Sequence, residues 1–521
     1  MTDSAGDTKD NPIVLTYDSQ AASKGSGIKT MIIGEQEKKD SSNCDNNSKQ
    51  IVVRNDCPFL DTIDRKALDF DFEKLCSISL SKVNVYACLV CGKYFQGRGK
   101  STHAFIHSVG ESHHVFLNLE TMKFYCLPDN YEIVDDSLSD ILYVLKPSFT
   151  SDTIERLDKQ TETAKAYDGK QYFPGIVGLN NLKHNDYCNV IFQALSHAIP
   201  LRNFFLIESN YAPVVSSSLD ERHALGYRFG ELVRKLWNPR NFKAHVSPHE
   251  MLQAIVLSSK KKFEFTKQSD PIIFLGWFLN NLMGPKREKS SIVKRTFQGK
   301  IGIATRLLIP DPSAPPSVSI TDEPQLIPAP EESYETTSFL YLTLDLPPMP
   351  LFPKKDERGK VIKPLVSIHE LLSKFDGKTK HESRGYRDAS IKRYEMLKLP
   401  NYLILYYKRF TRNTFFTEKN THLVDFQIDN LDLTKLLATG GASVEGKGDQ
   451  RLIKGHKYTL VANIVHDGEP DSGKGTYRAH IVHRPTGKWF ELQDLYVTEL
   501  ADTTLITLSE PYIQVWKLTK H

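Results

Sequence analysis

The chain has 521 residues, of which 40% are hydrophobic and 10% aromatic, with a mean hydropathy of −0.38. This composition can supply apolar cores, so it excludes a wholly disordered, collagen-like or disulfide-dense chain. The 67 Lys and Arg residues nearly balance the 63 Asp and Glu residues, and the net charge of +4 gives no broad basic field for nucleic acid. No run approaches the roughly 18 apolar residues of a membrane span, and the N-terminus lacks an apolar signal core. We therefore expect a soluble intracellular protein that has no membrane partner.

Residues 1–50 differ in composition from the rest of the chain. Only 13 of them are hydrophobic, and Tyr17 is their one aromatic residue. A segment this polar buries too little apolar surface to offset the entropy lost on ordering, so we predict a disordered tail over residues 1–52. The tail would serve as a solvated linker or as a docking arm.

The positions of the cysteines carry more information than their number. The seven are Cys44, Cys57, Cys76, Cys88, Cys91, Cys126 and Cys188. An odd count without an export signal indicates reduced thiols or metal ligands and argues against a disulfide framework. Because no cysteine follows Cys188, any thiol chemistry must come from the first 188 residues.

The segment YACLVCGKYFQGRGKSTHAFIHSVGESHHVF (86–116) combines two cysteines with four histidines. Cys88 and Cys91 precede a glycine and predict a knuckle, a tight turn whose two thiolates converge on one tetrahedral ion. A site with two cysteines and two histidines leaves three pairings open: His107 with His113, His107 with His114, or His103 with His107. Four protein ligands close the coordination shell, so the pattern predicts a structural zinc ion and not a catalytic one.

Beyond a polar connector predicted for residues 151–171, the pattern changes from helices to strands. Helical spacing marks 189–206 (interrupted at Pro200), 225–237 and 247–257. Strand patterns mark 402–410, 458–466, 477–483, 488–492 and 512–518. This order predicts an α+β domain with a mostly antiparallel sheet. Residues 309–330 contain seven prolines and predict an irregular surface insertion.

The succession C-L-x-C-G, G-R, H-A-x-x-H and a further histidine resembles the UBP-type zinc finger of ubiquitin-specific proteases, over residues 55–150. The resemblance implies that one structural Zn²⁺ ion is bound by Cys88, Cys91, His107 and His113.

Two departures from that finger family affect what the domain binds. Members with additional zinc ions use further cysteines, where this chain has Ser79 and Gln96, so we expect a single ion. In this family the loop around the G-R pair holds the C-terminal Gly-Gly of ubiquitin. That loop keeps Arg98 here but is otherwise changed, which argues against ubiquitin binding.

Residues 172–521 resemble the ubiquitin-specific protease domain. GLNNLKHNDYCN (178–189) is similar to the nucleophile motif, QSDPIIFL (268–275) to the helix that follows it, and LPNYLILYYKRF (399–410) to the L-P-x-x-L strand. YTLVANIVHDG, GTYRAHIV and KWFELQD are similar to the motifs of the catalytic histidine and the orienting acid. The resemblance implies a papain-like fold with fingers, palm and thumb.

The groups that catalysis requires are replaced in this domain. A cysteine protease needs a thiolate nucleophile, a histidine base and an orienting acid or amide. The matching positions hold Asp186, Thr476 and Gln493, and only Asn181, at the place of the oxyanion-stabilising asparagine, is retained. Cys188 lies about 200° around the helix from position 186, so it should point away from the cleft. We expect an inactive enzyme homologue in which Asp186 is the N-cap of a helix.

The combination of a single-zinc finger with N-D-Y and E-L-Q-D motifs resembles the inactive ubiquitin-specific-protease homologues associated with the spliceosome. That resemblance implies a nuclear scaffold in pre-mRNA splicing, which promotes assembly or stability of the U4/U6·U5 tri-snRNP by contacting U5 snRNP proteins. The alternative is a ubiquitin reader, meaning a protein that binds ubiquitin without catalysis. The basic stretch PKREKSSIVKR (285–295) permits at most a minor RNA contact, with a solvated loop as the default interpretation.

Overall fold

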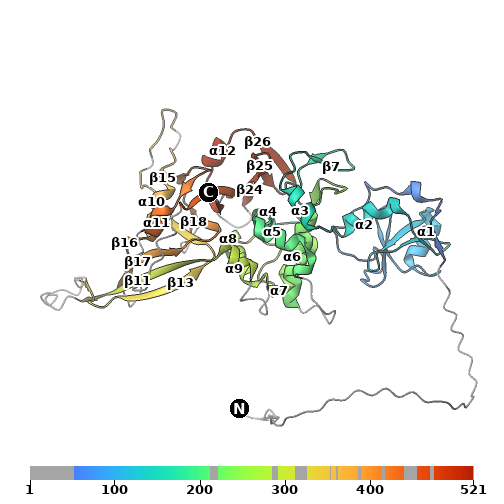
Figure 1. Ribbon diagram of the computed structural model, residues 1–521, viewed down its shortest axis with the longest axis horizontal. Helices are drawn as coiled ribbons and strands as arrows, with labels where there is room; N and C mark the ends of the chain where they lie inside the picture. Colours follow the sequence, from blue (N-terminus) through green and yellow to red (C-terminus); the bar gives the residue numbers. More distant parts are fainter. Residues whose placement is uncertain are drawn as a thin grey trace, which may run out of the picture. The chain divides into compact units, whose positions relative to one another are not determined.

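The computed structural model describes residues 52–211, 221–283, 291–310, 326–352, 354–359, 362–384, 389–412, 417–438, 455–469 and 474–519 (Figure 1). The tail predicted for residues 1–52 lies outside the described residues except at Val52, and residues 285–290 of the basic stretch also lie outside them. Within these ranges, no helix has both the length and the apolar character that crossing a bilayer demands.

Short runs of β-branched and aromatic residues form the first sheet, in the order β1-β6-β5-β4-β2-β3. Its strands are β1 (Val53–Arg54), β2 (Val85–Cys88), β3 (Tyr94–Gln96), β4 (Val115–Asn118), β5 (Phe124–Cys126) and β6 (Tyr131–Ile133). Because successive side chains of a strand point to opposite faces, β2 and β4 contribute to two different cores. Ala87 and Leu117 pack with residues of α2 (Ser139–Leu145). Phe116 and Cys88 pack with Ala104 of α1 (His103–Glu111).

The segment predicted as a connector, residues 151–171, has local structure of its own. Helix α3 (Ser151–Leu157) begins at a capping box, in which Thr150 and Thr153 each accept a hydrogen bond from the other's backbone N–H. Strands β7 (Ala164–Lys165) and β8 (Gln171–Tyr172) then pair as a hairpin. The α3 side chains Ile154 and Leu157 are buried in the core of the second domain, so this segment packs as part of that domain.

The second domain begins with a group of helices, as the sequence predicts. They are α4 (Asp186–Ser196), α5 (Ile199–Leu206), α6 (Glu221–Leu236), α7 (His249–Ser258), α8 (Pro271–Asn281) and α9 (Ile292–Phe297). The stretch 189–206 divides into α4 and α5 because Pro200 lacks a backbone N–H and is tolerated only in a first helical turn. Every residue of α4 is buried, so this helix lies at the centre of the domain.

A large sheet accompanies these helices, with strand order β14-β18-β27-β23-β24-β25-β26 and β22 paired to β23 (Figure 1). The strands are β14 (Leu342–Asp345), β18 (Tyr402–Lys408), β22 (Leu431–Asp432), β23 (Lys457–Gly468), β24 (Gly475–His483), β25 (Lys488–Gln493), β26 (Tyr496–Leu500) and β27 (Pro511–Leu518). The β14–β18 pair is parallel and the other pairs are antiparallel, which confirms the predicted sheet. On β18, Ile404 packs into the core around α4, and Leu405 into a second core on the opposite face.

A further sheet contradicts part of the prediction for residues 309–330. Its strands are β11 (Gly299–Pro310), β12 (Leu326–Pro328), β13 (Ser333–Phe339), β16 (Asp376–Arg384) and β17 (Ala389–Lys398). The prediction that residues 309–330 are irregular is wrong near both ends of this range, because Leu308 pairs with Pro328 and Pro310 pairs with Leu326. Both prolines are the last residues of their strands, where the missing N–H donor is tolerated. Residues 311–325 lie outside the described ranges.

The remaining described elements are short and connect these units. They are β9 (Gly178–Leu179), β10 (His245–Val246), β15 (Leu365–Ser367), β19 (Phe410–Arg412), β20 (Thr417–Lys419), β21 (Leu423–Asp425), α10 (Ile368–Leu372), α11 (Thr434–Ala438), α12 (Thr504–Thr507) and the 3₁₀ turns at Leu60–Thr62, Asp136–Leu138, Glu208–Asn210 and Ser373–Phe375. Parallel pairs join β9 to β10 and β15 to β21, and an antiparallel pair joins β19 to β20.

Two carboxylates of the first domain contact the second domain. Asp71 accepts hydrogen bonds from Lys235 Nζ and from the backbone N–H of Ser247, each at 2.8 Å. Asp69 accepts one from Lys243 Nζ at 2.7 Å. Phe242, which follows α6, is buried in the core of the first domain. Phe149 in turn is buried in the core of the second domain, so ion pairs and shared core side chains connect the two domains.

Candidate functional site

The predicted knuckle is formed by the end of β2 and the turn that follows it. Cys88 is the last residue of β2, and the turn closes through hydrogen bonds from Gly92 N to Cys88 O and from Cys88 N to Lys93 O, each at 2.9 Å. Gly92 has a φ of +73°, and a Cβ atom there would lie 2.3 Å from the carbonyl oxygen of Ala67. Only glycine fits this turn, which brings the Cys91 thiol beside the Cys88 thiol.

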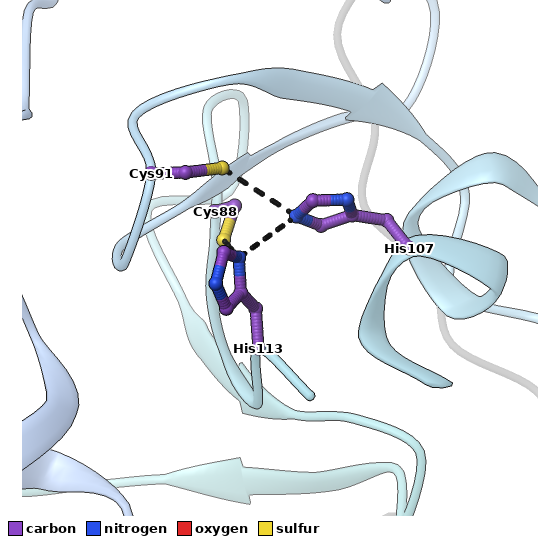
Figure 2. Close-up of side chains that lie close together, drawn as sticks. All are labelled: Cys88, Cys91, His107 and His113. Carbon is purple, nitrogen blue, oxygen red and sulfur yellow. Dashed lines mark hydrogen bonds between the residues drawn. The ribbon is translucent and has the colours of Figure 1, made fainter. Parts of the chain in front are cut away.

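The two histidines of the cluster come from helix α1 and from the segment after it. His107 lies on α1, and its ring stacks on Phe95 with the centroids 4.2 Å apart. The helix ends at Ser112, whose left-handed backbone (φ 57°) reverses the chain direction. This reversal returns His113 toward His107, and Figure 2 shows both rings directed at the two thiols.

The geometry of the four side chains fits a tetrahedral metal ion. All four ligand atoms lie within 4.8 Å of one another. Cys88 Sγ is 3.6 Å from His113 Nδ1, Cys91 Sγ is 3.4 Å from His107 Nε2, and the two ring nitrogens are 3.1 Å apart. A tetrahedron with metal–sulfur bonds of about 2.3 Å and metal–nitrogen bonds of about 2.0 Å has edges of roughly 3.3–3.8 Å. The cluster can therefore hold zinc with little movement.

The other histidines that the spacing left open are not part of this cluster. His114 is hydrogen-bonded through Nδ1 to the carbonyl oxygen of Leu127 at 2.8 Å and lies against Phe59. His103 is the first residue of α1 and is not among the four side chains that converge. Of the three pairings, the structure brings together His107 and His113.

The positions where related fingers carry further cysteines contain a hydrogen-bonded polar pair. Ser79 Oγ donates to Gln96 Oε1 at 3.0 Å, and the Ser79 N–H donates to Cys76 Sγ at 3.4 Å. Cys57 and Cys126 are buried, and Cys57 Sγ accepts a hydrogen bond from Tyr131 at 3.3 Å. Among the described residues, the Cys/His cluster around Cys88 is the one group arranged to hold a metal ion.

Arg98, the residue retained from the loop that binds ubiquitin in related fingers, contacts other residues of its own domain. Its Nη1 donates to Asn130 Oδ1 at 2.6 Å, and its guanidinium lies 4.3 Å from the centroid of the Tyr125 ring. An incoming carboxylate would have to compete with both contacts for this side chain.

Asp186 begins helix α4, but the prediction that it is the N-cap is wrong. The N-cap is Asn185, and Asp186 is the first helical residue. Its carboxylate is buried and hydrogen-bonded to other elements of the domain. Oδ2 accepts hydrogen bonds from Gln268 Nε2 at 2.7 Å and from the backbone N–H of Tyr477 at 3.1 Å. Asp186 therefore connects α4 to β24 and to the segment before α8, which local capping rules do not foresee.

The other degenerate positions lie beside Asp186. Thr476 directly precedes Tyr477 on β24, and its Oγ1 accepts a hydrogen bond from Gln493 Nε2 at 3.4 Å. The fold thus brings Asp186, Thr476 and Gln493 to the place where a nucleophile, a base and an orienting residue would meet. A carboxylate is a poor nucleophile toward an amide, and a threonine hydroxyl does not accept a proton near neutral pH.

The retained asparagine is engaged by a carboxylate. Asn181 Nδ2 donates to Asp494 Oδ2 at 2.9 Å, and Asn181 Oδ1 accepts from the backbone N–H of Asn185 at 3.1 Å. Asn189 Nδ2 donates to Asp494 Oδ1, also at 2.9 Å. The amide that would stabilise an oxyanion therefore already donates to an anionic side chain.

Two groups that could supply the missing chemistry, Cys188 and His466, are buried. Cys188 has no exposed surface, and burial raises the pKa of its thiol well above the usual value. His466 lies beside Gly475, but burial lowers the pKa of its imidazole to about 4. The rings of Phe410 and Tyr477 pack against His466. Both groups are core residues.

Sequence reasoning missed two residues whose hydrogen bonds connect the segments around Asp186 and Asn181. Gln268 donates both to Asp186 and to the carbonyl oxygen of Gly475, the latter at 2.9 Å. Asp494 binds Asn181 and Asn189 from a left-handed backbone position (φ 51°). Gln268 lies in QSDPIIFL and Asp494 lies in KWFELQD, two segments that resemble protease motifs. Their places in these segments were the signal that could have identified them.

The charge of Asp186 gives a prediction on stability. Burial is the main cause that raises the pKa of this carboxyl, and its Oδ1 atom has no hydrogen-bond partner. A carboxyl group whose pKa is raised by folding binds its proton more tightly in the folded state. Its stabilising contribution is therefore complete below the unfolded pKa and is lost as the pH rises through the folded pKa.

We expect Asp186→Asn to raise the free energy of unfolding at pH 7 by about 1 kcal/mol, because it removes a buried charge and keeps the side-chain shape. The gain should shrink as the pH falls below about 4, the ordinary pKa of an Asp carboxyl, because the wild-type carboxyl then becomes protonated in the unfolded state as well as in the folded state. Urea denaturation at several pH values measures this difference, with the exposed Asp56→Asn as the matched control. A gain that grows on acidification would contradict the assigned direction of the pKa shift.

The fold and the two sites define a zinc-finger protein that carries a ubiquitin-specific-protease domain. Comparison with protein families agrees: residues 177–516 match the family "Ubiquitin carboxyl-terminal hydrolase", and residues 76–138 match "Zn-finger in ubiquitin-hydrolases and other protein". The chain belongs to the ubiquitin carboxyl-terminal hydrolase family. This confirms the predicted α+β class and the predicted pairing of a UBP-type finger with a protease domain.

Individual relatives include proteins named for splicing. The chain is 56% identical to human "Ubiquitin carboxyl-terminal hydrolase 39" over 468 residues, covering 88% of this chain and 80% of the relative. It is 40% identical to "Probable mRNA-splicing protein ubp10" of Schizosaccharomyces pombe, covering 88% of each. Identity to "Pre-mRNA-splicing factor SAD1" of Saccharomyces cerevisiae is 30%, covering 88% of this chain and 93% of that protein.

The fold is also similar to that of a solved structure. The "Crystal structure of an essential yeast splicing factor" superposes with a TM-score of 0.67 at 29% identity. The superposition covers 89% of this chain and 100% of that one, so the likeness extends over both domains.

Proposed function

We propose that this protein is a non-catalytic scaffold of pre-mRNA splicing, which acts in the nucleus and promotes assembly or stability of the U4/U6·U5 tri-snRNP. Contacts with U5 snRNP proteins would carry this role. The observation that carries the proposal is the Asp186 carboxylate, buried and hydrogen-bonded at the nucleophile position. The relatives named for splicing support the cellular role.

The loss of catalysis does not rest on one substitution. Thr476 and Gln493 hydrogen-bond to each other, and Asn181 donates to Asp494. Nucleophile, base and oxyanion donor are thus all replaced or engaged, while the fold that positions them persists. A protease domain in this condition offers a large folded surface for binding partners.

We further propose that the finger binds one structural Zn²⁺ ion through Cys88, Cys91, His107 and His113. When bound, the ion would cross-link the turn after β2, helix α1 and the segment between α1 and β4, and four protein ligands would leave no open coordination position for chemistry. The hydrogen-bonded pair of Ser79 and Gln96 supports a count of one ion.

The alternative, a ubiquitin reader, has less support because Arg98 already contacts Asn130 and Tyr125. Direct RNA binding also has little support, since the net charge of +4 is spread over 521 residues. The ubiquitin reader predicts recovery of ubiquitin conjugates, whereas direct RNA binding predicts that RNA is recovered without the snRNP proteins.

Native purification of the tagged full chain at low salt, with sequencing of the RNA recovered, tests the proposal. We expect enrichment of U4, U5 and U6 snRNAs over an untagged control. High salt should release the RNA together with snRNP proteins if the contacts are made by protein. Recovery of ubiquitin conjugates without these snRNAs would overturn the scaffold role in favour of the ubiquitin reader.

A further inference from the structure

The loop between β14 and β15 exposes an unusual amount of apolar surface. Leu351 and Phe352 are 92% and 90% exposed, more than any other large apolar side chain in the described part of the chain. Ile362 (51%) is exposed in the returning half of the same loop, and Leu365 (66%) is the first residue of β15. Single exposed apolar side chains are ordinary, but three in one loop and a fourth directly after it indicate an interaction surface. These four residues are called the apolar tip below.

Hydrogen bonds hold both halves of this loop to the rest of the domain. Asn420 Nδ2 donates to the carbonyl oxygen of Pro347 at 2.7 Å, which fixes the outgoing half. Ile362 N donates to the carbonyl oxygen of Lys354 at 2.8 Å, which joins the two halves. Lys363 Nζ pairs with Glu510 Oε1 at 2.5 Å, just before β15 joins β21.

Proline reduces the freedom of the loop further. Pro347, Pro348 and Pro350 precede the Leu351–Phe352 pair, and each fixes its own φ angle. Described loop residues that are restrained by these hydrogen bonds and prolines lose little conformational entropy on binding, so their exposed apolar side chains can contribute most of their burial energy to affinity.

The described charges beside the apolar tip have a small positive excess. Lys354, Lys355 and Arg358 are exposed on the same loop, and Asp356 and Glu357 are its described acids. Lys363 adds a fourth cation, which Glu510 neutralises. A partner surface that surrounds the apolar tip would therefore be complementary if acidic groups bordered its apolar cleft.

We propose that this loop is a docking element, whose Leu351 and Phe352 side chains insert into an apolar cleft bordered by carboxylates on another protein. The inference rests on the proposed function, since that protein would be a component of the splicing particle. A protein cleft is favoured over RNA because Phe352 is the one aromatic ring of the apolar tip, whereas single-stranded RNA binding stacks successive bases on several rings. It is favoured over a lipid surface because the loop is short and its cations are interrupted by Asp356 and Glu357.

Binding of the full chain to purified U4/U6·U5 tri-snRNP depleted of its endogenous homologue tests this proposal. We expect Leu351→Ser combined with Phe352→Ser to weaken binding at least tenfold, because aromatic and large apolar anchors dominate interfaces. Lys354→Glu combined with Lys355→Glu should weaken binding by a smaller factor. That factor should be larger at low salt, where charges are screened less. The matched control is Ile106→Ser with Val109→Ser on α1, which are 56% and 59% exposed and lie outside the loop. Thermal unfolding of each variant should match wild type, since all four positions changed in the loop are exposed.

A photo-crosslinking amino acid, p-benzoylphenylalanine, placed at position 352 identifies what contacts the apolar tip. A crosslink to an apolar segment of a particle protein that is flanked by acidic residues supports the proposal. A crosslink to RNA would overturn it. So would sedimentation of the wild type, but not of the double variant, with anionic vesicles. If wild type and the Leu351/Phe352 variant bind the particle equally, the docking role fails alone. If wild type does not bind the particle, the proposed function fails with it.

Discussion

Purified protein will release no fluorophore from a ubiquitin C-terminal amide above the buffer rate, and Asp186→Cys alone will not change this. Among the described residues, the thiol nearest in sequence to position 186 is that of Cys188, which is completely buried, and burial raises its pKa. A cysteine placed at position 186 would still lack a base, since Thr476 occupies the histidine position. In other proteases, loss of a nucleophile or of its base lowers kcat by a factor on the order of 10⁶.

The assay needs an active ubiquitin-specific protease as positive control and Cys188→Ser as the matched negative control. Both the wild type and Cys188→Ser should give the buffer rate. Turnover by wild type that disappears in Cys188→Ser would show that the buried thiol reaches the substrate, and the non-catalytic proposal would then be wrong. Turnover by Asp186→Cys would show that another group, with His466 beside Gly475 the first candidate, can act as the base.

Most helices and strands could be predicted from the sequence because the residue types within a short segment favour one or the other. Runs rich in β-branched and aromatic residues predicted strands such as β18 and β23, and Pro200 predicted the break between α4 and α5. The long β11–β17 pairing was not predicted. Most positions of both strands are only part-buried or exposed, and β17 carries four charged residues, so the apolar pattern that marks a buried strand is weak there.

The site was harder to predict in detail because its contacts join distant parts of the chain. Asp186 was expected to cap its own helix, yet its partners Gln268 and Tyr477 are 82 and 291 residues away. Among the histidines, spacing alone left three pairings open. The left-handed backbone of Ser112 directs His113 into the cluster, and residue spacing does not reveal such a turn.

The second large effect concerns zinc. His107→Ala should lower the zinc content of the purified protein from about one equivalent to nearly none, and it should unfold residues 55–150. Structural zinc sites contribute apparent free energies of about 10 kcal/mol or more, comparable to the whole stability of a typical domain. Inductively coupled plasma mass spectrometry counts the metal, and hydrogen exchange of β2 and β4 reports the folding of the finger. His103→Ala is the matched control, because His103 lies on the same helix outside the cluster.

The second domain should remain folded in His107→Ala, because the core around α4 begins at Phe149 and draws on no strand of the finger. Hydrogen exchange in the second domain should rise only around Phe242, which loses its packing in the finger core, and around Lys235, which loses its contact with the Asp71 carboxylate. A full equivalent of zinc retained in His107→Ala would show that His107 is not a ligand. Two equivalents in wild type, with one lost in His103→Ala, would instead establish a second ion. Exchange that rises throughout β23 and β24 would show that the two domains fold as one cooperative unit, held by the contacts of Asp69, Asp71 and Phe242.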